Sequence, residues 1–140
     1  MLFRSLRRHA CDNVTTRPLD ASGGARRGVG MKEPHPLDFL ALADEVVSAL
    51  PRGRGHLADQ LSRASTSIVL NLAEGAGKFS KPDKRRYYLT AVGSTTESAA
   101  IFDVFLRLKL ITADQHSVAK GMLERIAAML VKLAKAQEGE

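Results

Sequence analysis

The sequence of 140 residues lacks tryptophan, has a single cysteine and contains only 5% aromatic residues. The one cysteine, Cys11, excludes an internal disulfide and offers no cluster of metal ligands, so we expect a reducing compartment and a cytoplasmic protein. No apolar run approaches the roughly 18 residues that a membrane-spanning helix needs. Runs of β-branched residues are also scarce, whereas alanine, leucine and charged residues dominate, which favours helix over strand.

The positive charge is distributed unevenly along the chain. Of the formal net charge of +6, residues 1–30 carry +4 from six arginines and two aspartates, which leaves +2 for the remaining 15 basic and 13 acidic residues. The N-terminal segment has no helical or alternating period and contains a Gly-Gly pair, which is typical of disorder. We predict a disordered basic tail over residues 1–33, with two alternatives: an upstream extension before a true start at Met31, or an electrostatic arm for nucleic acid.

Hydrophobic periodicity predicts four helices joined by short links, over residues 37–50, 56–75, 81–108 and 113–137. Ser80 and Thr112 are suitable N-caps for the last two helices. The Gly75–Gly77 segment suits a helix end with a residue in the left-handed region. Because short links make neighbouring helices antiparallel, the sequence predicts an all-α fold for residues 34–140: an antiparallel up-down-up-down four-helix bundle.

The residue types that serve catalysis and metal binding are present but do not form a recognisable site. The four histidines are scattered, and none of their spacings matches a zinc site. Glu74, Glu97 and Asp103 could meet across two predicted helices, but no Glu-x-x-His pair of the di-iron type accompanies them. We therefore predict no enzymatic activity, no metal, no cofactor and no small-molecule substrate.

The second predicted helix carries a narrow polar stripe beside its apolar one. Five polar residues fall within an arc of roughly 80°: Gln60, Arg63, Ser67, Asn71 and Glu74. Apolar residues occupy much of the remaining surface, which is typical of a helix that packs on more than one side. We predict that Asn71 and Glu74 are hydrogen-bonded in a seam against another helix or subunit, with Arg63 or Arg86 beside Glu74. An exposed solvent face is the alternative.

The same helix begins a segment, "ADQLSRASTSIVLNLAEGAGKFSKPDKRRYYLTAVGSTTES", that carries a family resemblance. It is similar to the signature of the four-helix-bundle proteins encoded in intervening sequences of bacterial large-subunit ribosomal RNA genes. That family includes the accessory variability determinants of diversity-generating retroelements. The signature positions are Gln60, Arg63, Ser67, Asn71, Glu74 and Gly75, followed by Gly93 and Glu97. The similarity covers about residues 37–136.

The resemblance implies a homopentamer with a positively charged surface, without catalytic activity, that binds nucleic acid or a nucleic-acid enzyme. Apolar surface left over on the second and third predicted helices agrees with an oligomer, although periodicity does not give the number of subunits.

A basic cluster follows the polar stripe within nine residues: Lys78, Lys81, Lys84, Arg85 and Arg86. Positive charge at a helix N-terminus is unfavourable, so several cations there suggest a compensating use; a solvated turn is the alternative. Arg52 and Arg54 form a second basic patch, which an antiparallel bundle places at its opposite end. Tyr87 and Tyr88 could offer a stacking face, although we expect Tyr87 in the core.

We therefore predict a non-enzymatic, oligomeric four-helix-bundle protein that binds nucleic acid, with RNA favoured over DNA, by neutralising phosphates with these seven basic residues. The alternative is a protein scaffold or accessory factor that docks a nucleic-acid enzyme such as a reverse transcriptase.

Overall fold

The computed structural model describes residues 33–139, which contain four α-helices and no strand. The helices are α2 (Pro36–Ser48), α3 (Gly55–Gly77), α4 (Lys81–Arg107) and α5 (Ala113–Lys135). Every helix boundary lies within two residues of its predicted position, and the all-α prediction is confirmed. The predicted tail and the alternative start at Met31 lie outside the described residues, except for Glu33.

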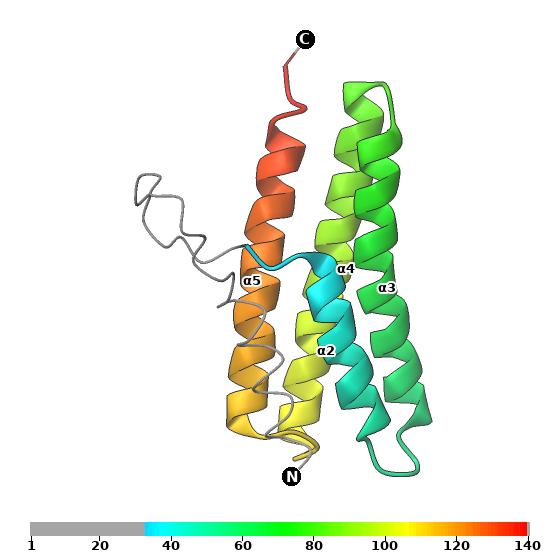
Figure 1. Cartoon of the computed structure of the whole chain (residues 1–140), viewed down its shortest axis with the longest axis vertical. Coiled ribbons are helices and arrows are strands. Elements are labelled where there is room, and N and C mark those ends of the chain that lie inside the picture. Colours follow the sequence, from blue (N-terminus) through cyan, green and yellow to red (C-terminus); the bar gives the residue numbers. More distant parts are fainter. Residues whose placement is uncertain (1–32, 140) are drawn as a thin grey trace, which may run out of the picture.

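The helices form an antiparallel bundle in which α2 packs on α3 and α5, and α4 packs on the same two helices from the other side (Figure 1). α2 has 13 residues whereas α3 has 23, so their lengths are about 20 and 35 Å at a rise of 1.5 Å per residue. α2 lies beside the half of α3 that adjoins their common loop (Figure 1). Toward the α3–α4 turn the bundle therefore consists of three helices.

Local capping rules explain where three helices begin. Ser80 Oγ accepts from the backbone N–H of Asp83 at 3.2 Å, and Thr112 and Gln115 form a reciprocal capping box, as predicted. His35 forms a second box with Asp38: its Nδ1 accepts from Leu37 N–H at 3.0 Å, and the Asp38 carboxylate accepts from His35 N–H at 3.0 Å. His35 therefore serves the fold.

The core is built around three phenylalanines from two helices. Phe39 of α2 and Phe102 of α4 have ring centroids 5.8 Å apart, and Phe102 and Phe105 lie 5.7 Å apart in an edge-to-face arrangement. All three are fully buried. Aliphatic side chains of α3 and α5 complete this cluster: Leu61, Ile68, Leu123, Ile126 and Leu130.

Candidate nucleic-acid interface

The five cations of the predicted cluster lie together at the end of the bundle formed by the α3–α4 turn, and we call this set the basic tip: Lys78, Lys81, Lys84, Arg85 and Arg86. The C-terminal end of the chain reaches the same end of the molecule (Figure 1). Arg52 and Arg54 lie in and beside the α2–α3 loop, at the opposite end. Within one chain, the predicted basic residues thus form two separate patches.

The Tyr87 ring contacts two cations of the basic tip. Lys78 Nζ lies 5.1 Å and Arg86 Cζ 5.0 Å from the Tyr87 ring centroid, distances typical of cation–π contacts. Tyr87 is half-buried, whereas Tyr88 is buried in the core. The expectation that Tyr87 fills the core is therefore wrong; one residue corresponds to about 100° of helix rotation, and this step turns Tyr88 inward instead.

Lys84 caps the preceding helix. Its Nζ donates to the carbonyl oxygens of Gly75 at 3.2 Å and Ala76 at 3.0 Å. These carbonyls end α3 and carry the partial negative charge of its dipole. The start of α4 lies beside the end of α3, so the positive charge that is unfavourable for one helix is favourable for the other. The capping role therefore accounts for Lys84 without the need for a bound ligand.

The other cations of the basic tip have exposed partners. Three ion pairs are present: Lys78–Glu74 at 3.5 Å, Arg86–Asp83 at 3.9 Å and Arg85–Glu138 at 3.2 Å. Lys81 Nζ donates to the carbonyl oxygen of Gly139 at 3.4 Å. Five cations and three carboxylates leave a net charge of +2 at the tip. Exposed pairs contribute at most about 1 kcal/mol each, so a phosphate can displace these partners.

The turn between α3 and α4 also carries an aromatic residue that sequence reasoning missed. Phe79 follows the C-cap residue Lys78 and precedes the N-cap residue Ser80, and its side chain is fully exposed. The available signal was an apolar aromatic residue in the Lys-Phe-Ser-Lys segment, where periodicity offers it no helix face.

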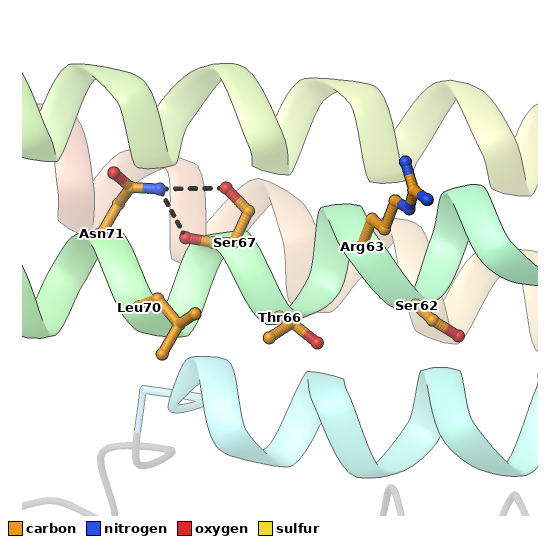
Figure 2. A pocket seen from close by; sticks show the side chains of 6 residues that line it. All are labelled: Ser62, Arg63, Thr66, Ser67, Leu70 and Asn71. Carbon is orange, nitrogen blue, oxygen red and sulfur yellow. Dashed lines mark hydrogen bonds between the residues drawn. The ribbon is translucent and has the colours of Figure 1, made fainter.

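Part of the polar stripe forms the predicted seam. Asn71 Nδ2 donates to the Ser67 carbonyl oxygen at 2.8 Å and to Ser67 Oγ at 2.9 Å (Figure 2). Ser67 Oγ in turn lies 2.7 Å from Ser94 Oγ of α4. Glu74 is not in the seam. It is exposed and pairs with Lys78, four residues on, rather than with Arg63 or Arg86.

The two signature glycines have different surroundings. A Cβ on Gly75 would lie 2.6 Å from Cε1 of Tyr88 and 2.8 Å from its Cδ1, so only glycine fits against this ring. The predicted left-handed helix end is wrong: α3 continues to Gly77, and its C-cap residue Lys78 has a φ of −80°. Gly93, on α4, is exposed, and a Cβ there would meet nothing within 4 Å.

The outer surfaces of α3 and α4 keep apolar side chains in contact with solvent. On α3, a shallow open hollow extends from the seam residues Ser67 and Asn71 to the exposed Leu70 (Figure 2), and its lining is completed by Ser62, Arg63 and Thr66. On α4, Leu89, Gly93, Ala100 and Val104 are exposed and share the face opposite the core. The signature residues Gln60, Arg63 and Glu97 are exposed as well.

The three carboxylates considered as a paired site are not joined. Asp103 faces α5, where its Oδ1 lies 2.7 Å from His116 Nε2 and 3.0 Å from Lys120 Nζ. These hydrogen bonds, His116 first and Lys120 second, lower the pKa of Asp103. Among residues 33–139 there is no group of histidine, cysteine and acidic side chains that could hold a metal ion. Within the same range, none of the helices has the length and apolarity to cross a membrane.

Comparison with known proteins gives a family and a fold. A family model described as "23S rRNA-intervening sequence protein" matches residues 39–132. A crystal structure of a protein of unknown function from the S23 ribosomal protein family of Bacteroides thetaiotaomicron is similar, with a TM-score of 0.67 and 20% identity. The match covers 71% of this chain and 94% of that chain, and at this identity it shows the fold alone. No curated protein matches.

Proposed function

The chain belongs to the 23S rRNA-intervening sequence protein family, and from this premise we propose that it is a non-enzymatic protein that binds nucleic acid, RNA in particular, through the basic tip. The observation that carries the proposal is the gathering of five cations on one end of the bundle, with a net charge of +2 after their three carboxylate partners. Residues 31–140 as a whole also carry a net charge of +2, so the charges outside the tip sum to zero, with Arg52 and Arg54 as a separate basic patch.

On binding, phosphate oxygens would replace the weak partners that four cations of the basic tip have in the free chain. Lys78, Lys81, Arg85 and Arg86 hold exposed carboxylates or a carbonyl, and a phosphate oxygen offers each of them a charge-assisted hydrogen bond. Such contacts position the nucleic-acid backbone but give no base specificity. Lys84 contributes charge while it remains on the α3 carbonyls, so we no longer expect it to contact phosphate directly.

We further propose that the chain acts as a homo-oligomer, the pentamer that the resemblance implies. The exposed stripe with Leu89, Gly93 and Val104 supports this proposal, because glycine in a helix interior costs about 1 kcal/mol relative to alanine. Nothing within the described chain requires glycine at position 93, whereas a second backbone in close approach would. An oligomer would present several basic tips to one strand and raise its apparent affinity.

A second candidate function is a protein scaffold that docks a nucleic-acid enzyme. The hollow around Leu70, which is 58% exposed, favours this alternative, because a single apolar side chain in an open depression suits a protein partner better than a phosphate backbone. In that case the basic tip would lie against the nucleic acid already bound by the enzyme.

A salt titration tests the proposed function. Affinity for a structured RNA should fall with salt, with a slope of about −0.7 per phosphate contact for single-stranded segments. The double variant Lys81→Gln/Arg86→Gln should flatten the slope by roughly 1.4, two contacts' worth. Arg107→Gln/Lys109→Gln makes the same change in charge at the opposite end and is the matched control. The variant Arg52→Gln/Arg54→Gln measures how much the second basic patch contributes to the same slope.

Equal loss in the Lys81/Arg86 variant and in the Arg107/Lys109 control would show a general effect of charge and reject the tip as the binding surface. Salt-independent binding, or no binding, by the unmodified protein would favour the scaffold.

A further inference from the structure

We propose that Phe79 is a stacking platform for an unpaired base, so that the tip selects single-stranded or looped RNA over uninterrupted duplex. The inference rests on the nucleic-acid binding proposed above and adds a ligand class to it. It is carried by a fully exposed phenyl ring on the turn that joins the two helices of the basic tip.

The exposure of Phe79 contrasts with that of the other phenylalanines in the described chain. Its relative exposure is 103%, whereas Phe39, Phe102 and Phe105 are each at 0%. Burial of a phenylalanine side chain stabilises a fold, and Phe79 contributes none of this stabilisation in the folded chain. The fold therefore gives no reason for an aromatic residue at this position.

The turn that carries Phe79 is fixed on both sides. Lys78 N–H donates to the Gly75 carbonyl oxygen at 3.3 Å, and Lys84 N–H donates to the Ser80 carbonyl oxygen at 3.0 Å. Ser80 Oγ caps α4, and Lys84 Nζ joins this helix to the last carbonyls of α3. The ring thus projects from an ordered three-residue turn, Lys78–Ser80, which reduces the entropy lost when a ligand binds.

The neighbours of Phe79 indicate an anionic ligand with flat apolar parts. Lys78 and Lys81 flank the ring in sequence, one residue before it and two residues after it. A cationic groove beside an aromatic side chain is the usual arrangement for binding single-stranded nucleic acid, in which phosphates meet the cations and a base stacks on the ring. The Tyr87 ring already contacts Lys78 and Arg86, so Phe79 is the aromatic ring of the tip that is free to stack on a base.

A single ring suits a base better than a membrane. The other large apolar side chains that are exposed in the described residues are Leu37, Leu70, Leu89, Val104 and Leu108, and none of them belongs to the Lys78–Arg86 segment. A lipid surface would meet only Phe79 at this end, whereas one base requires only one ring. In a duplex the bases are already stacked, and the ring gains nothing.

The test uses three RNA probes that share nearly the same number of phosphates: a 20-nucleotide single strand, a blunt 10-base-pair duplex and a 20-unit abasic ribose-phosphate strand. Phe79→Ala should weaken binding of the single strand by about 5- to 150-fold, the value of one stacked base. Binding of the duplex and of the abasic strand should not change. Phe79→Trp should preserve affinity for the single strand, whereas Phe79→Leu, apolar but not aromatic, should lose it.

The outcomes separate this inference from the proposed function. If the unmodified protein binds all probes in a salt-dependent way and Phe79→Ala changes none of them, the basic tip stands and the stacking role is rejected. If Phe79→Ala weakens all three probes equally, the ring supports the turn and stacks on no base. If no probe binds at any salt concentration, both proposals fail. If Phe79→Ala instead lowers binding to phosphatidylserine vesicles and leaves RNA binding intact, the ring belongs to a lipid interface and the inference is overturned.

Discussion

The inner and outer faces of α3 and α4 carry residues of the same signature, but they differ in where their partners lie. On the inner face, Ser67 bonds to Ser94 of α4 and accepts from Asn71, and Gly75 gives room to the Tyr88 ring. On the outer face, Arg63 and Gly93 are exposed, and a Cβ at Gly93 would meet nothing. The inner residues are explained by the packing of one chain, whereas the packing of the described chain does not explain the outer ones.

The largest effect should come from Gly75→Ala, which breaks the inner face at its tightest point. A Cβ 2.6 Å from the Tyr88 ring must displace that buried side chain, and overpacking of this kind costs about 1–3 kcal/mol. Urea denaturation measures the loss of unfolding free energy. Gly77→Ala is the matched control, since its Cβ would meet nothing within 4 Å. Equal stabilities of the two variants would show that α3 and α4 can separate at no cost.

Asn71→Ala should cost less, about 1 kcal/mol, because Asn71 is only partly buried and its Nδ2 donates two hydrogen bonds within the seam. Glu74→Ala should cost less than about 0.5 kcal/mol, since the exposed pair with Lys78 contributes little. Thermal melts of both variants compare the stability lost at a seam residue with that lost at an exposed residue of the same polar stripe. A larger loss from Glu74→Ala would place that residue in an interface between chains.

Local chemistry made the helices predictable. Capping by Ser80 and Thr112 depends on the next three residues, so the sequence contains the whole signal. Positions whose role depends on a distant residue were not predictable in the same way. A glycine near a helix end has two common uses, and only the approach of Tyr88, 13 residues away in sequence, identifies the one that applies to Gly75. Lys84 was assigned to binding because the carbonyls that it caps belong to another helix.

Side-chain direction explains the remaining errors. Tyr87 and Tyr88 are adjacent aromatic residues, and the hydrophobic period of α4 fits either of them, so a rotation of about 100° decides which is buried. Glu74 lies in the same polar arc as Ser67, only about 20° away around the helix, so the helical period does not separate the seam residue from the exposed one. Phe79 has no helical period at all, and its exposure became visible only once the turn had a structure.

Gly93→Ala should stabilise the single chain, but it should weaken assembly if the outer face is an interface between chains. In an isolated helix the change should stabilise the chain by about 0.5–1 kcal/mol, because the added Cβ meets nothing in the described residues. In a close-packed oligomer the same methyl group would hold two backbones apart. Sedimentation at several protein concentrations, together with thermal melts, separates the two effects. A variant that is more stable and assembles as before would show that position 93 faces solvent in the assembly too.

The smallest effect concerns the C-terminal residues beside the basic tip. Glu138 pairs with Arg85 at 3.2 Å, with both side chains about half exposed, so an incoming phosphate must displace this carboxylate. Glu138→Gln removes its charge and should raise affinity for RNA by about twofold, which corresponds to the few tenths of a kcal/mol of an exposed pair. The gain should be largest at low salt, since screening weakens both the pair and the phosphate contact.

Glu124→Gln is the matched control. It makes the same change on an exposed side chain of α5, away from the tip, and should alter affinity less. An equal gain in both variants would mean that RNA responds to the total charge of the chain, and the distinction between the tip and the rest of the outer surface would be lost.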